Sequence, residues 1–254
     1  MLPLVRSDDL KNQTASAVLK EASGLDGLFL LPIRMEKLDF YEFTRGPLAM
    51  ISFAILILGS CFRLIGFFIR GTNPKLLYPK QNLIHGFVSI AYGLIPFATR
   101  FMRQRPLFTS VTVLFHLCAL LVPLFFFSHI VLWFESYGLL WKALSDGMAD
   151  IMTLFVLFAC IFFFVRRMVI PEVRMVSQRS DFLILILIFI SFLTGFLSFH
   201  QYGPYRPMLI THILAGEALI AVIPFSRLWH MIVYPFSRYY MGADFGTVLK
   251  ARDW

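Results

Sequence analysis

Long apolar stretches alternate with short charged segments along most of this chain. Five of these stretches reach or approach the roughly 20 residues with which a helix crosses the apolar core of a bilayer. They cover residues 47–69, 107–134, 147–170, 181–199 and 208–234. The pattern predicts an all-α integral membrane protein with five transmembrane helices.

Residues 81–99 are also uncharged, but their pattern differs from that of a spanning helix. The apolar residues fall on one helical face, whereas Asn82, His85, Ser89 and Gly93 fall on the other. Basic residues flank the segment on both sides, so a crossing would carry one basic cluster across the membrane, against the positive-inside rule. We therefore expect an amphipathic interfacial helix between the first two spans, in preference to a sixth span.

The composition supports a membrane protein. Hydrophobic residues make up 58% of the 254 residues and charged residues 15%, which is too low for a soluble domain of this size. The net charge of +8 does not indicate nucleic-acid binding, because the basic residues cluster in loops between apolar spans. We expect an extramembrane N-terminal extension (residues 1–46), a five-helix membrane domain (47–235) and a C-terminal tail (236–254).

The loop charges predict the orientation of the chain. Six basic residues lie in residues 70–106 and four in residues 166–180, whereas the two remaining loops carry one each, Lys142 and Arg206. The basic loops and the C-terminus are therefore expected in the cytoplasm, and the N-terminus outside.

The three cysteines, Cys61, Cys118 and Cys160, all lie in apolar spans. The chain has no Cys-x-x-Cys-His motif, which excludes covalent attachment of a c-type haem. The cysteines also lack the paired spacing of zinc or iron–sulfur sites. We expect them to be buried as small apolar side chains.

Four histidines lie near the ends of two predicted spans. His212 and His230 are eighteen residues apart, about five turns of a helix, so an unbroken helix would place both on one face, about 27 Å apart. The second span carries His116 and His129. Because these spans run antiparallel, depth pairs His116 with His230 toward the cytoplasm and His129 with His212 toward the outside. Each pair is expected to supply both axial ligands of one haem iron.

The second span fits this arrangement less simply than the fifth. Thirteen residues separate His116 from His129, which leaves their side chains about 140° apart on an ideal helix. Pro123 lies between them and is expected to kink or rewind the span. His200, at the outer end of the fourth span, is the alternative ligand if His129 does not bind; otherwise it faces water or a partner.

Four charged side chains within or beside the spans are further candidates. Arg63 and Arg227 lie in the inner halves of their spans. An arginine within the membrane either pairs with a negative group, such as a haem propionate, or extends its side chain to the cytoplasmic membrane surface. Arg206, just before the fifth span, is placed to serve the outer haem. Glu217 is the acid deepest in a span, so it either relays protons to a quinone, a site to which His200 could also belong, or bonds, as a neutral acid, to a neighbouring helix.

The end of the fifth span carries a resemblance to a known family. Residues 224–230 (Pro-Phe-Ser-Arg-Leu-Trp-His), followed by Pro235 and Arg238, resemble the end of the last span in the gamma subunit of respiratory nitrate reductase. The spacing of His212 and His230 is also similar. The second span and the long N-terminal extension depart from that pattern, so the chain looks more like the related cytochrome b subunits of the Tmc, Hmc and Dsr complexes of sulfate reducers.

The resemblance implies two haem b groups held by the second and fifth spans of a subunit in the cytoplasmic membrane of a bacterium or archaeon. It also implies menaquinone or another quinone near the outer haem, an iron–sulfur subunit on the cytoplasmic side and a multihaem cytochrome c outside. The chain would then pass electrons across the membrane within a quinone-linked oxidoreductase. Two other functions fit the spans, a haem-free anchor for soluble subunits and a proton-conducting transporter.

Overall fold

The computed structural model of the protein describes residues 40–71 and 83–244. Most of the predicted N-terminal extension therefore lies outside the described residues. The first helical segment, α2 (Phe40–Phe43), continues through a π-helical segment (Thr44–Leu48) into α3 (Ala49–Gly71). The first apolar helix thus begins several residues before the position expected from the sequence.

Within the described ranges, five helices are long and apolar enough to cross a membrane, which confirms the predicted number. They are Phe40–Ile69, which includes most of α3; α6 (Pro106–Phe125); α8 (Asp146–Val169); α10 (Arg179–Phe199); and Tyr205–Phe225, which consists of α11 (Tyr205–Val222) and a following 3-10 turn.

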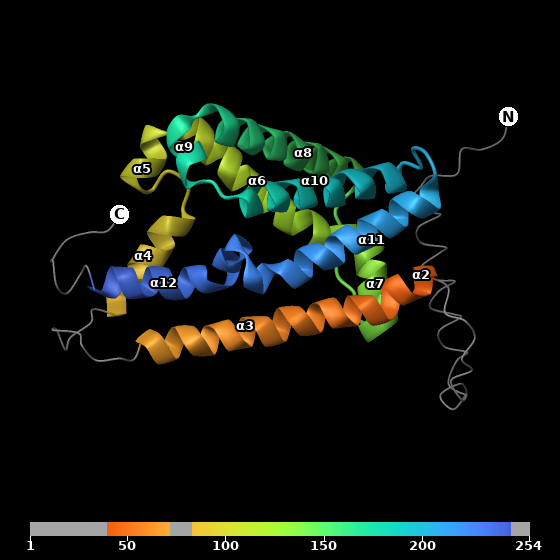
Figure 1. Cartoon of the computed structure of the whole chain (residues 1–254), viewed down its shortest axis with the longest axis horizontal. Coiled ribbons are helices and arrows are strands. Elements are labelled where there is room, and N and C mark those ends of the chain that lie inside the picture. The colour runs from red at the N-terminus through yellow and green to blue at the C-terminus, as the bar shows by residue number, and fades with distance from the viewer. Residues whose placement is uncertain (1–39, 72–82, 245–254) are drawn as a thin grey trace. The chain divides into compact units, whose positions relative to one another are not determined.

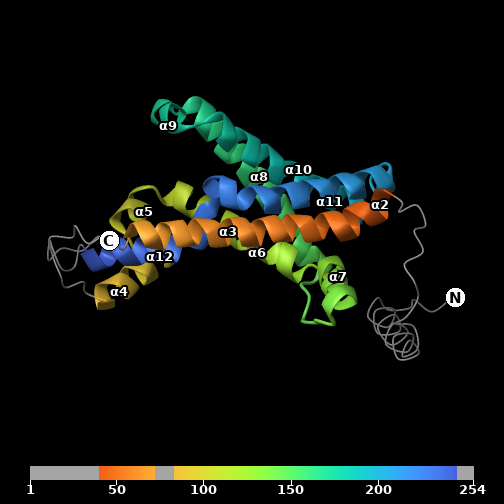
Figure 2. The same cartoon turned by 60° about the horizontal axis from the view of Figure 1, so that its bottom comes forward.

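The spans pack in an order that differs from their order in sequence. Helix α10 packs between α8 and α11, α8 also packs on α6, and α3 lies beside α11 (Figures 1 and 2). The buried core joins α6, α8 and α10. Its residues are Cys118 and Val122 of α6, Met152, Val156 and Cys160 of α8, and Ile188 of α10. Large apolar side chains are exposed on every span, as expected for surfaces that face lipid.

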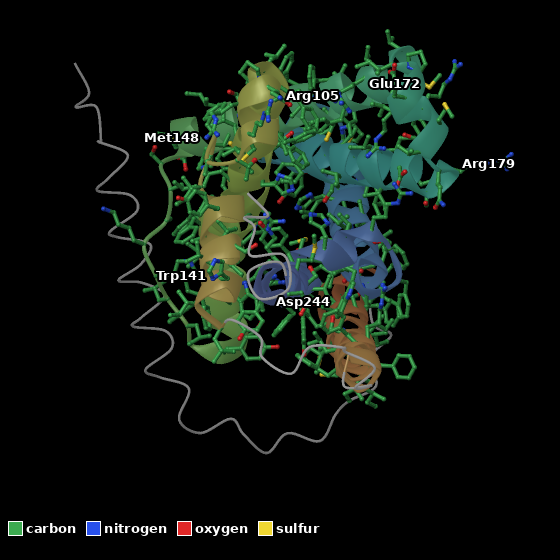
Figure 3. The ribbon with its side chains drawn as sticks, turned by 90° about the vertical axis from the view of Figure 1, so that its left-hand side faces the viewer. Arg105, Trp141, Met148, Glu172, Arg179 and Asp244 are labelled. Atoms are coloured by element: carbon green, nitrogen blue, oxygen red, sulfur yellow. The ribbon has the colours of Figure 1, made fainter. Side chains whose placement is uncertain are left out.

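The short helices α5 (Arg100–Gln104) and α9 (Pro171–Val176) lie toward one end of this bundle (Figure 1). Figure 3 looks onto that end, where Arg105, Glu172 and Arg179 are labelled. The predicted cytoplasmic loops therefore contribute to one end of the bundle. At the opposite end, Arg45 forms an ion pair with Glu135 of α7 (Phe127–Tyr137).

The segment expected at the interface forms α4 (Leu83–Leu94), a helix of twelve residues that is too short to cross a bilayer. The sequence suggested that the small and polar face of this helix would face water, but in the structure it does not. It packs against α12 (His230–Asp244), with Gly86 and Ser89 buried, while apolar residues such as Phe87 are exposed. Small residues let the two backbones approach closely. Such close packing drives helix association in a membrane, because burying apolar surface there gains little free energy.

Substitution of Gly242 by valine is expected to separate α4 from α12. A Cβ atom at this position would lie 2.8 Å from the carbonyl oxygen of His85, a backbone atom that cannot move alone. Overpacking of this kind costs about 1–3 kcal/mol. Unfolding in detergent would measure the loss of stability. Gly46→Val is the control, because a Cβ atom at that position would meet no atom within 4 Å. Equal stability of the two variants would contradict the close packing.

Candidate functional site

The four histidines of the second and fifth spans form two close pairs. His116 of α6 lies beside His230, the first residue of α12, with ring centroids 5.9 Å apart and ring planes at 85°. His129 of α7 lies beside His212 of α11, also with centroids 5.9 Å apart, and these two rings are nearly parallel at 6°. The structure thus brings together the residues that the sequence paired by depth.

All four imidazoles share one hydrogen-bonding pattern. Each Nδ1 lies within hydrogen-bond distance of a main-chain carbonyl: Thr112 for His116 (2.7 Å), Pro123 for His129 (2.9 Å), Ser191 for His212 (2.8 Å) and Arg227 for His230 (2.7 Å). A carbonyl oxygen can only accept, so Nδ1 carries the proton and donates. In a neutral ring this leaves the lone pair on Nε2, the nitrogen then available to a metal.

The break between α6 and α7 sets the position of His129. The predicted span 107–134 is not one helix, because Phe126 adopts an extended conformation (φ −73°, ψ 132°) three residues after Pro123. Three carbonyls at the end of α6 accept other donors: Pro123 from His129 Nδ1, Leu124 from Trp141 Nε1 and Phe125 from the Leu144 amide. The break therefore both reorients His129 and supplies its hydrogen-bond acceptor.

The fifth predicted span is also interrupted, which corrects the expectation of a continuous helix over residues 208–234. Helix α11 ends at Val222, two 3-10 turns follow (Ile223–Phe225 and Arg227–Trp229), and α12 begins at His230. Proline at position 224 cannot donate to the preceding turn, which favours such a break. Five turns of one continuous helix therefore do not connect His212 to His230, and the interrupted backbone sets the relative positions of the two rings.

Helix α3 supports this interruption. Arg63 donates from Nη1 to the carbonyl of Pro224 (2.6 Å), and its guanidinium lies 5.0 Å from the ring centroid of Trp229. A Cβ on Gly59 would lie 2.9 Å from Cγ of Pro224, so only glycine permits this contact. Arg63 thus binds the main chain and an aromatic ring at the break, neither of which the sequence identified as its partner.

Arg227 has a carboxylate partner within the chain. Its Nη1 lies 2.9 Å from Oδ2 of Asp181, whose side chain is 2% exposed. The same oxygen lies 3.6 Å from Arg167 and accepts a hydrogen bond from the backbone amide of Gln178 at the start of α10.

Arg206 lies in the first turn of α11 and is exposed, six residues before His212.

The other two candidate residues do not join the histidine pairs. His200 lies 3.0 Å (Nε2 to Oδ1) from Asp150 of α8, and its ring stacks near Tyr202. Glu217 is 7% exposed, and neither of its carboxyl oxygens has a hydrogen-bond partner. Its surroundings are thus those of a buried acid, between the two histidine levels along the fifth span.

Two residues of α10 that were not predicted from the sequence contact the imidazole of His212. Ser191 provides the carbonyl that accepts from its Nδ1, and Gly195 lies so close that a Cβ there would be 2.8 Å from Cε1 of the ring. Both belong to a series of small residues that recurs along this span and includes Thr194 and Ser198, both buried. Such a series in an apolar helix indicates close approach of another helix and could have identified this face.

The ring separation within each pair, 5.9 Å between centroids, matches the spacing of two imidazoles on one metal ion. Two imidazoles that bind one metal ion from opposite sides have ring centroids about 6 Å apart, since each metal–nitrogen bond is about 2 Å long. In residues 40–71 and 83–244, no cluster of three or more His, Cys, Asp or Glu side chains is placed to hold a metal ion. Paired imidazoles therefore suit a haem iron, which receives its other ligands from the macrocycle.

The fold and the site define a multi-pass membrane protein with histidine pairs at two levels. The sequence profile of the nitrate reductase gamma subunit matches residues 107–208, a range that includes His116 and His129. A protein of Nitratidesulfovibrio vulgaris (strain Hildenborough), a sulfate reducer, is 35% identical over 211 residues, which cover 81% of this chain and 93% of that protein. The chain belongs to the nitrate reductase gamma subunit family, whose members are cytochrome b-type membrane subunits of respiratory complexes in the bacterial inner membrane.

Proposed function

We propose that this chain is a dihaem b-type cytochrome that transfers electrons across the membrane between a quinone and the soluble redox subunits of its complex. The observation that carries the proposal is the shared arrangement of the four histidines, two pairs at 5.9 Å with every Nδ1 bonded to a carbonyl. His116 and His230 would hold the inner haem, and His129 and His212 the outer one.

When bound, each haem would supply one-electron redox chemistry, and the two imidazoles of one pair would hold it. The chain's own part is to fix the four rings. The carbonyl acceptors hold each ring in one tautomer and one orientation, as the outer hydrogen bonds of metal-bound histidines do. The two helix breaks provide the acceptors for His129 and His230, and α6 and α10 provide the others.

We infer the orientation of the complex from its basic residues. We propose that the end of the bundle with α5 and α9 is cytoplasmic, because positive charge accumulates on that side of the membrane. An iron–sulfur subunit would dock there, and a multihaem cytochrome c would dock at the opposite side. The family resemblance favours menaquinone or another quinone beside the outer pair. Glu217, buried without a hydrogen-bond partner, is the residue that we assign to proton exchange with this quinone.

A reduced-minus-oxidised optical spectrum of the purified protein tests the proposal. We expect a b-type signal and, by extraction of the haem, two haem groups for each chain. A protein that folds as a monodisperse membrane protein but shows no such signal would refute the cytochrome. A haem-free anchor or a proton-conducting transporter would then remain, and proton flux in sealed vesicles would separate these two.

A further inference from the structure

A cavity of about 340 Å³ lies beside the inner histidine pair, and both His116 and His230 line it. Aromatic and aliphatic side chains of α6, α8 and α10 form much of its wall, among them Phe108 and Phe163. Charged side chains also line it, and these are Arg166, Arg167, Asp181 and Arg227. The cavity thus combines an apolar wall with a strongly charged region.

The charges in this cavity do not balance. Three guanidinium groups line it against the single carboxylate of Asp181, which leaves two positive charges in excess when the imidazoles are neutral. Asp181 pairs with Arg227 at 2.9 Å and lies 3.6 Å from Arg167. Arg166 lies over the ring of Phe108, 4.2 Å from its centroid, and pairs with no carboxylate in the described part of the chain.

An excess of positive charge beside apolar side chains favours an anion as the ligand of this cavity. The guanidinium fork binds a carboxylate or a phosphate in two-point fashion. A ligand with two carboxylates would neutralise the excess, and a b-type haem carries two propionates on one edge. Phosphate groups of a lipid would also satisfy the arginines, although they would not fill the apolar part of the cavity.

We propose that Arg166 and Arg167 of α8 bind the propionates of the haem held by His116 and His230. This inference rests on the proposed function. It replaces Arg63 in this role, because Arg63 does not line the cavity and binds the carbonyl of Pro224 instead. Arg227 acts as a positioning residue here: Asp181 holds its side chain, while its main-chain carbonyl accepts from Nδ1 of His230.

Redox titration of Arg166→Gln and Arg167→Gln in the full chain tests this assignment. Reduction adds negative charge to the haem, and a nearby guanidinium favours it, so each variant should lower the midpoint potential of one haem only. We expect about a tenfold lower ratio of reduced to oxidised haem at the wild-type midpoint, which is 59 mV for one electron. Arg166→Lys, which keeps the charge, should restore most of the shift.

Arg174→Gln is the matched control, because this arginine is exposed on α9 and does not line the cavity. Loss of one haem from the Arg166 or Arg167 variant, with Arg174→Gln unchanged, would also support the assignment. An equal shift in all three variants would overturn it, since a general surface field would then be the cause.

Unchanged midpoints and unchanged haem content in both cavity variants would overturn it as well. Loss of tightly bound phospholipid phosphate in that case would identify a lipid headgroup as the anion. A wild-type protein without any haem would instead refute the proposed function, and this assignment with it. The haem content of the wild type therefore separates the two failures.

Discussion

Replacement of His212 by alanine is expected to remove one haem from the protein and to leave the other in place. His212 and His129 form the outer pair. His200, the alternative ligand, is bonded to Asp150 and is therefore not expected to replace His212. An iron with one axial ligand lost is held much less tightly, whereas His116 and His230 keep their own carbonyl partners. Haem content should fall to about half of the wild-type value, as expected when one of two axial pairs is lost.

His200→Ala is the control for this variant, and it should retain both haems. The spectrum also reports which haem is lost if the two differ in midpoint potential. Loss of both haems from a His212→Ala protein that remains folded would mean that the two sites are not independent. Loss of neither would show that the pairing by depth is wrong.

Replacement of Gly195 by valine is expected to have a similar effect, although this residue binds nothing itself. A Cβ at this position would lie 2.8 Å from Cε1 and 2.9 Å from Nδ1 of His212. Because α10 packs tightly on α11, the ring and not the helix has to move, and the bond from its Nδ1 to the Ser191 carbonyl is lost. Removing an outer hydrogen bond of a metal ligand costs about 10–100-fold in affinity, and displacing the ring costs more.

The measurement is again haem content, together with the low-temperature spectrum of the outer haem. Gly147→Val is the matched control: this residue lies in the first turn of a spanning helix, and a Cβ atom there would meet no atom within 4 Å. A Gly195→Val protein with two haems and wild-type spectra would contradict the role of this close approach.

Several features of the fold were predictable because they depend on local sequence. A run of apolar residues long enough to cross a bilayer forms a helix wherever it lies, since no water is present to satisfy its backbone. The five spans follow from this rule, and their observed bounds lie within a few residues of the predicted ones for α8 and α10. The small residues that pack α4 on α12 are also visible in the sequence, although their partner is not.

The arrangement of the histidines was predictable only in part. Depth along antiparallel helices pairs His116 with His230 and His129 with His212, and the structure brings these side chains together. The rotation of about 140° between His116 and His129 on an ideal helix opposed the pairing. The extended conformation of Phe126 removes that difficulty, but a proline three residues earlier does not specify where the chain will break.

The amino-acid sequence alone established a five-helix membrane protein with four histidines on two spans and a basic end, because length, apolar content and charge are properties of each segment by itself. Only the tertiary structure decided that Asp181 pairs with Arg227, that Arg63 binds at the break after α11, and that the imidazole of His212 meets the carbonyl of Ser191. These contacts join residues far apart in the chain, so they depend on how the helices pack and on where two of them break.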